Sequence, residues 1–172
     1  MSIKSESNSE FTFLSAEKAS SIQVGIVVSE WNEKVTSSLL KACINSLKKY
    51  HITEDNILVK WVPGSFELAL GAQWLFEYKN VDAVACLGCI IKGETPHFHY
   101  ISESVALSIS NLSLKYNRPA AFGVITAETG QHAIDRSGGK VGNKGEEAAL
   151  ALLKMLQIKT DLAEPKSRLG FK

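Results

Sequence analysis

Short, strongly apolar runs alternate with longer stretches of helical periodicity, and this alternation limits the fold more than any other feature of the chain. Four runs are rich in Val, Ile and Ala: IQVGIVVS (22–29), NILVKWV (56–62), AVACLGCII (83–91) and AAFGVIT (120–126). The third run has no polar residues at alternate positions, which is typical of a strand buried on both faces of a parallel sheet. The runs therefore predict four strands.

Segments with helical spacing follow these strands. In the first segment, apolar residues recur every four positions: Val35, Leu39, Cys43 and Leu47. Asn32 is a favourable N-cap for this helix, which is expected to end near Tyr50. Three more helices are expected over residues 66–78, 98–112 and 144–156. A short helix in TGQHAIDRSGG is expected to end at Gly138 and Gly139.

Four alternations of strand and helix with short connections imply an α/β three-layer sandwich. Its four-stranded parallel sheet would carry helices on both faces, joined by right-handed crossovers. The length of 172 residues fits one domain. We expect a flexible N-terminal arm over residues 1–20, the folded domain over 21–158 and a C-terminal tail over 159–172.

Charge and composition exclude several classes of protein. The formal net charge is +1, which gives no reason to expect a nucleic acid or an anionic membrane as partner. The chain has no run of about 18 apolar residues that could span a bilayer. Its three cysteines, Cys43, Cys86 and Cys89, lie in predicted helix and strand, which favours a reduced, cytoplasmic setting. Packing explains the C-x-x-C of Cys86 and Cys89 better than redox or metal chemistry does.

The loops at the carboxyl ends of parallel strands are where ligands bind in an open sheet. Here these loops are SEWN (29–32), VPGSFE (62–67), CIIKGETPH (89–97) and ITAET (125–129). They carry an aromatic surface at Trp31, a carboxylate at Glu67 and a group of Gly, Thr and His from Gly93 to His97. The combination favours a flat polar ligand together with an anion.

The segment KGETPHFHY (92–100) has two interpretations. Thr95 followed by Pro96 is a common N-cap and first-turn pair, and helices begin in this way without binding anything. Alternatively, free backbone N–H groups near Thr95 could bind phosphate at the helix N-terminus. Histidine ordinarily titrates near pH 6.5, so His97 is a candidate for proton transfer or simply a surface residue. His99 would point away from His97, and the pair lacks metal-ligand spacing, so no metal site is expected.

Two basic residues near the C-terminal helix also have alternative roles. Arg136 could bind a phosphate in bidentate fashion or stabilise the end of its short helix. Lys144 lies in a glycine-rich segment, GGKVGNKG, that lacks the pattern of a nucleotide phosphate loop.

Four motifs in order resemble the lumazine synthase family of riboflavin biosynthesis: VPGSFELAL, GCIIKGETPHFHYISESV, PAAFGVIT and RSGGKVGNKGEEAA. The similarity extends from about Ile22 to Leu156 and implies a flavodoxin-like fold. It implies condensation of 5-amino-6-(D-ribitylamino)uracil with 3,4-dihydroxy-2-butanone 4-phosphate, giving 6,7-dimethyl-8-ribityllumazine, phosphate and water, with no cofactor. A container for flavins or lumazines that does not turn over, and a related riboflavin synthase, are the alternatives.

The resemblance also implies residue roles. Trp31 would stack on the pyrimidine ring, His97 would transfer protons, and Arg136 would face the phosphate. The remaining substrate positions would be Ser65, Phe66 and Glu67 for the ribityl chain and ring edge, Cys89, Ile90 and Ile91 for the ring through backbone groups, and Glu94 and Thr95 for the phosphate. Trp31 stands where Phe is common in the family, and its larger face predicts tighter binding of flavin-like ligands.

Assembly is a further implication of the resemblance. Family members form pentamers, in which the positions of Phe122, Arg136 and Lys144 reach into a neighbour's site. The N-terminal arm adds a strand to the next subunit's sheet, a use for the apolar residues Phe11, Phe13 and Leu14. A sixty-subunit shell is compatible with the compact RSGGKVGNKG segment, and riboflavin synthase is a candidate partner.

Overall fold

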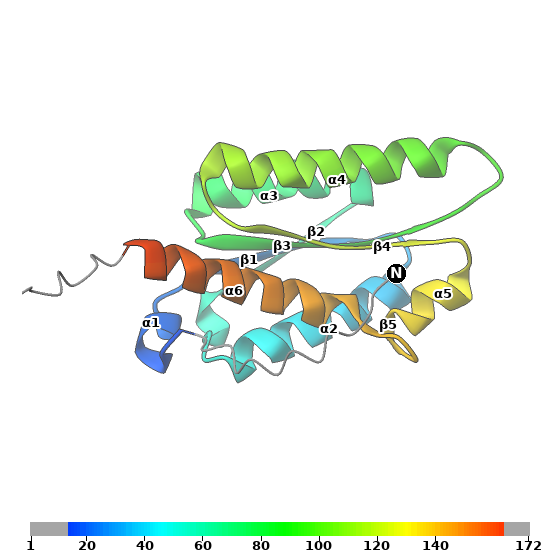
Figure 1. The fold of residues 1–172 in the computed structure, drawn as a ribbon. Helices are drawn as coiled ribbons and strands as arrows, with labels where there is room; N and C mark the ends of the chain where they lie inside the picture. Colours follow the sequence, from blue (N-terminus) through cyan, green and yellow to red (C-terminus); the bar gives the residue numbers. More distant parts are fainter. Residues whose placement is uncertain (1–13, 164–172) are drawn as a thin grey trace, which may run out of the picture.

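A computed structural model describes residues 14–163 of the chain. Four parallel strands form one sheet in the order β2-β1-β3-β4, with bounds β1 (Val24–Ser29), β2 (Ile57–Val62), β3 (Ala83–Ile91) and β4 (Ala120–Ala127). Helices cover both faces (Figure 1), which confirms the predicted three-layer α/β sandwich. The strand order is that of the flavodoxin-like fold, in which ligands bind where the order reverses, here between β1 and β3.

Each face of the sheet has its own helices and its own core. On one face lie α3 (Leu68–Lys79) and α4 (His97–Tyr116), and on the other lie α2 (Glu33–Lys49), α6 (Lys144–Ala163) and the short α1 (Ala16–Ser20) and α5 (Gly130–Asp135). Strand β1 is buried along its whole length. Its side chains alternate between the two cores: Val28 packs on the α2 and α6 side and Val27 on the α3 and α4 side. No helix within residues 14–163 is long and apolar enough to cross a membrane.

The helix start predicted at Asn32 is confirmed in position, because Asn32 is the N-cap residue of α2, whereas the start predicted at Thr95 is wrong. Asn32 precedes α2 in a left-handed conformation (φ 60°, ψ 44°), and its side chain makes no capping hydrogen bond. The amide instead reaches the backbone carbonyl of Cys89. Helix α4 begins at His97 with Pro96 at the cap position and no side-chain cap, so Thr95 lies one residue too early to cap it.

The predicted end of the short helix at the glycine pair is also wrong. Helix α5 ends at Asp135, and residues Ser137–Gly139 (β5) then pair with Gly142–Asn143 (β6) in an antiparallel hairpin. Gly138 has φ +116°, a conformation that residues with a Cβ rarely adopt. The conformational freedom of Gly138 therefore allows the backbone to form this hairpin and does not end a helix.

Packed structure extends beyond both ends of the domain expected at residues 21–158. Near the N-terminus, Leu14 and Ala19 are buried in the core, and Ser15 caps α1 by accepting a hydrogen bond from the Lys18 N–H. Helix α6 continues to Ala163. The expected apolar residues Phe11 and Phe13 lie outside the described residues.

Candidate active site

A cavity of about 580 Å³ opens at the carboxyl ends of β1, β2 and β3. It is lined by Trp31, Asn32, Pro63, Gly64, Ser65, Phe66, Glu67, Cys89, Ile90, Ile91, Gly93, Thr95, His97, Phe98 and Ile101. Three of the four loops predicted from the sequence therefore meet in one place. Most of the predicted substrate residues lie in this lining.

Two large aromatic side chains are exposed at the cavity. Trp31 is 74% exposed and Phe66 is 57% exposed. Exposing two such rings to water does not stabilise the fold. Exposed apolar side chains that line a cavity are typical of ligand-binding sites. Together they offer faces on which a flat ring can stack.

The segment after β2 is pressed against β3 because Gly88 has no side chain. Residues Ser65–Glu67 form a single 3₁₀ turn, and Ser65 is buried. A Cβ placed on Gly88 would lie 2.7 Å from Ser65 Oγ and 2.9 Å from Leu68 Cδ1. Gly88 thus lets the Ser65 hydroxyl reach the cavity wall beside the end of β3.

The end of β3 extends beyond its partner on one side. The register of β3 with β4 continues to Ile91–Ala127, whereas the register with β1 ends at Val28–Leu87. Backbone groups past this point on the β1 side lie outside the ladder and can bind a ligand. One of them, the Cys89 carbonyl, accepts a hydrogen bond from Asn32 Nδ2 at 3.0 Å.

The cysteines serve packing, as predicted. Burial raises the pKa of the Cys43 and Cys86 thiols to about 12 and that of Cys89 to about 11. Cys86 and Cys89 belong to different hydrophobic clusters, one on each face of the sheet. Neither thiol is therefore suited to nucleophilic or redox chemistry near neutral pH.

The loop between β3 and α4 brings an open backbone and an imidazole to the cavity. Gly93, Thr95 and His97 line it, and no atom lies within 4 Å of a Cβ placed on Gly93. Two contacts hold the start of this loop to the end of β4: the Lys92 N–H donates to the Ala127 carbonyl at 2.9 Å, and Lys92 Nζ lies 2.8 Å from Glu128 Oε2. The start of the loop is therefore held in place, and a ligand anion could bind to the free N–H groups that follow.

The ion pair at this loop perturbs one carboxylate. The hydrogen bond from Lys92 lowers the pKa of Glu128, partial desolvation opposes the shift, and the charges of Lys92, His99 and His132 reinforce it. His99 itself does not line the cavity and instead contacts the Phe98 ring edge-on, with 5.3 Å between centroids. His97 and His99 are thus separated as the sequence predicted.

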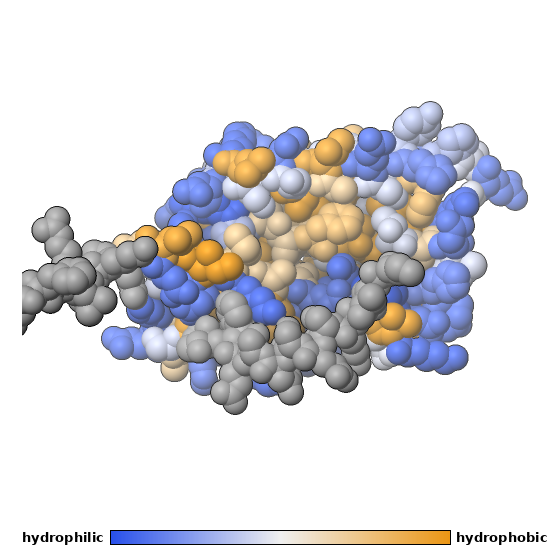
Figure 2. Space-filling model, viewed as in Figure 1, coloured by the Kyte–Doolittle hydropathy of each residue, from blue (hydrophilic) through white to orange (hydrophobic). Residues whose placement is uncertain are grey.

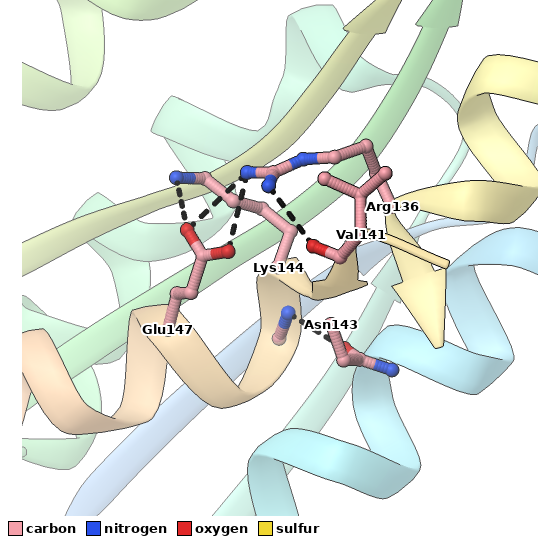
Figure 3. A network of polar contacts seen from close by, with 6 residues as sticks. Arg136, Val141, Asn143, Lys144 and Glu147 are labelled. Carbon is pink, nitrogen blue, oxygen red and sulfur yellow. Dashed lines mark hydrogen bonds and ion pairs between the residues drawn. The ribbon is translucent and has the colours of Figure 1, made fainter. Parts of the chain in front are cut away.

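Four predicted site residues do not line the cavity: Glu94, Phe122, Arg136 and Lys144. Figure 3 shows where the two cations lie. Arg136 Nη2 is 3.2 Å from Glu147 Oε1, and Lys144 Nζ is 3.0 Å from Glu147 Oε2. Arg136 Nη1 also donates to the Val141 carbonyl at 3.2 Å. Within residues 14–163, neither Lys nor Arg is among the residues that line the cavity.

Asn32 is one of several lining residues that were not predicted as site residues, the others being Pro63, Gly64, Phe98 and Ile101. Its position before an amphipathic segment suggested a helix cap, and that interpretation hid a second possibility. The signal was its place in the SEWN loop, beside the aromatic residue and at a strand's carboxyl end.

Fold and cavity together define an α/β protein of flavodoxin-like architecture, with a cavity of small-molecule size at the carboxyl edge of its sheet. Residues 21–160 match the sequence profile of the family described as 6,7-dimethyl-8-ribityllumazine synthase. The chain belongs to this family.

Relatives with that name cover most of the chain. The synthase of Parabacteroides distasonis is 47% identical over 150 residues, which is 87% of this chain and 94% of the relative. That of Cytophaga hutchinsonii is 53% identical over 132 residues, covering 77% and 83% of the two chains. That of Bacteroides fragilis is 47% identical over 137 residues, covering 80% and 96%.

Proposed function

We propose that the cavity condenses 5-amino-6-(D-ribitylamino)uracil with 3,4-dihydroxy-2-butanone 4-phosphate to give 6,7-dimethyl-8-ribityllumazine, phosphate and water. Family membership makes the protein a transferase of riboflavin biosynthesis. The observation that carries the proposal is the meeting of three loops at one cavity: an exposed Trp31, the Ser65–Glu67 turn and the Gly93–His97 segment. Neither alternative, a flavin container or a riboflavin synthase, is favoured by any feature of this site.

Each part of the cavity has a role in binding two substrates. Trp31 stacks on the pyrimidine ring, and Phe66 flanks the same space. Ser65 and Glu67 supply a hydroxyl and a carboxylate, which suit the hydroxyls of the ribityl chain. The backbone at the end of β3 hydrogen-bonds the ring edge, and the N–H groups near Glu94 and Thr95 receive the phosphate.

His97 moves the protons of the reaction. The ring amine attacks the ketone and a first water leaves to form an imine. Phosphate then leaves by elimination. The ribityl-bearing amine attacks the carbonyl that this elimination generates, and loss of a second water closes the lumazine ring. Each step gives or takes a proton, and an exposed imidazole on the cavity wall can do both. Holding the two substrates side by side supplies most of the remaining acceleration.

A neighbouring copy completes the site. Among the described residues, no Lys or Arg lines the cavity, whereas Arg136 and Lys144 gather at Glu147 outside it. We place Phe122, Arg136 and Lys144 of one subunit against the cavity of the next, in a homopentamer that a sixty-subunit shell could extend. Figure 2 supports this arrangement, because a hydrophobic area lies between α4 and α6 over the edge of β4. Apolar side chains exposed on these two helices include Leu107, Leu114, Met155, Ile158 and Leu162.

Two further assignments follow from chemistry. Three buried, unpaired thiols fit the reducing cytoplasm, where we place the protein. Riboflavin synthase consumes the lumazine product, so we propose it as a partner in the pathway.

One assay tests the function. Both substrates are mixed with the protein, and phosphate release is followed together with lumazine fluorescence. Equal amounts of phosphate and lumazine are expected, and His97→Ala should slow both by about 10²- to 10⁴-fold without abolishing them. Binding without phosphate release would identify a container, and consumption of added lumazine without phosphate would identify a riboflavin synthase. Either result would overturn the proposal.

A further inference from the structure

The side chain of Asn32 links two loops that are 57 positions apart in the sequence. Its Nδ2 donates to the Cys89 carbonyl at 3.0 Å, and this hydrogen bond is partly buried. The backbone carbonyl of Asn32 accepts hydrogen bonds from the N–H groups of Val35 and Thr36, and these bonds start α2. One residue thus joins the start of a helix to the end of β3.

This link lies just past the point where β1 and β3 cease to pair. The last pair of that ladder is Val28 with Leu87, although β3 continues to Ile91. Within the described residues, the Asn32 side chain is therefore what continues the connection on the β1 side. Its hydrogen bond to Cys89 takes the place of a further backbone hydrogen bond between the two strands.

Trp31 lies between two such anchors. On its N-terminal side, the Glu30 N–H donates to the Val62 carbonyl at 2.9 Å, which ties the loop to the end of β2. On its C-terminal side, Asn32 ties the loop to the end of β3. The Trp31 ring itself is 74% exposed, so its position depends on how firmly its backbone is held.

We propose that Asn32 is a positioning residue for the ring substrate. It holds Trp31 at a fixed separation from the end of β3, so that the stacking surface and the hydrogen-bonding edge fit the same flat ring. The inference rests on the proposed function for the identity of that ring.

The same link assigns the ring's backbone partner. Successive residues of a parallel strand direct their N–H and C=O groups to opposite neighbours. The Lys92 N–H points to β4, so Ile90 does the same and Cys89 and Ile91 face the β1 side. Asn32 engages only the Cys89 carbonyl, so the Cys89 N–H and the backbone groups of Ile91 are left for the ring.

Asparagine suits this position for two separate reasons. Its φ of 60° is left-handed, a region that Asn, Asp and Gly enter more readily than other residues. Its amide is a donor, which a carbonyl partner requires. Asn32→Gly keeps the conformation and removes the donor, while Asn32→Asp keeps a residue tolerant of this conformation and turns an oxygen toward the Cys89 carbonyl.

Asn117 offers a matched control. It is also left-handed, with φ 49°, and it ends α4 away from the cavity. Asn117→Gly therefore makes the same chemical change without touching the loop of Trp31.

The first measurement does not depend on activity. In a Trp61→Phe, Trp74→Phe background, Trp31 is the only tryptophan, and its time-resolved fluorescence anisotropy reports motion of the loop. Both Asn32 variants should increase the amplitude of the fast decay, and Asn117→Gly should not. A change in Asn32→Gly alone would assign the effect to glycine's backbone freedom and overturn the inference, as would no change in either.

The second measurement compares the change in KM for the ring substrate with the change in KM for the butanone phosphate. A single neutral hydrogen bond is worth about a threefold to tenfold change in affinity, so both Asn32 variants should raise KM for the ring substrate by about that factor. KM for the butanone phosphate should stay within about twofold, because its cradle follows β3. Equal rises in both values would refute positioning of the ring. If the unmodified protein formed no lumazine, the proposed function would fail while the anisotropy result still stood.

Discussion

Replacing Gly145 with alanine is expected to force α2 and α6 apart. A Cβ at Gly145 would lie 2.0 Å from the Leu39 carbonyl oxygen and 2.8 Å from Leu39 Cα. These are backbone atoms, so no side-chain rotation can relieve the clash. Contacts shorter than about 3 Å are not tolerated, so the two helices must separate by roughly 1 Å at this crossing.

The cost follows from the packing that this movement disturbs. Leu39, Leu152 and Leu153 are buried in the same core on this face of the sheet. Inserting one methyl group into a close-packed core costs about 1 to 3 kcal/mol when side chains can adjust, and a backbone clash belongs at or above the upper end. A loss of about 3 kcal/mol lowers the Tm of a domain of this size by roughly 6 to 12 °C.

Gly130→Ala provides the control for this experiment. Gly130 likewise lies in the first turn of a helix, but nothing lies within 4 Å of a Cβ placed there. Both variants and the unmodified protein should be heated at one protomer concentration, because assembly makes Tm concentration-dependent. Gly130→Ala should stay within about 0.5 kcal/mol of the unmodified protein. A Gly145→Ala protein of equal stability would refute the close crossing of α2 and α6.

Three other perturbations give separate tests. Arg136→Ala should raise KM for the butanone phosphate by roughly tenfold to a hundredfold, as expected for a lost charge-assisted hydrogen bond, and unchanged KM in steady-state kinetics would remove Arg136 from the site. The pKa of Glu128 is lower in the folded protein than in the unfolded chain. Its ion pair with Lys92 therefore stabilises the fold at pH values above the unfolded-state pKa. This stabilisation is lost as the pH falls through the folded-state pKa. Denaturant titrations of Glu128→Gln should therefore match the unmodified protein in acid and show a deficit at neutral pH; a deficit equal at both would contradict this. Trp31→Phe should weaken riboflavin binding in a fluorescence titration, and equal affinity would show that the larger ring gains nothing.

The parts of the fold that the sequence predicts are those that depend on burial. The run from Ala83 to Ile91 is apolar because helices cover both faces of this strand. The absence of polar residues from this run can be recognised from the sequence alone. The spacing of Val35, Leu39 and Leu47 likewise reports one buried helix face. Strands, helices and the loops at the cavity could therefore be placed without coordinates.

Loop details depend on contacts between distant residues, and periodicity does not report these. Asn32 starts α2 with its backbone carbonyl, while its side-chain Nδ2 donates to the Cys89 carbonyl. Short elements such as α1 were missed for a related reason. Five residues carry too little periodic signal, and the burial of Ala19 depends on the surrounding core.

The hairpin after α5 explains why two cations eight positions apart can act together. Arg136 is the C-cap residue of α5, and Lys144 begins α6. The Lys144 N–H donates to the Arg136 carbonyl at 2.9 Å across the base of the hairpin. Gly138 and Gly142, with φ +116° and +85°, make the tight reversal possible. The two side chains then share Glu147, so the group keeps one net positive charge on a partly exposed surface. A phosphate brought to it would meet a cation pair already oriented by a carboxylate, whereas the cavity, as residues 14–163 line it, has no Lys or Arg.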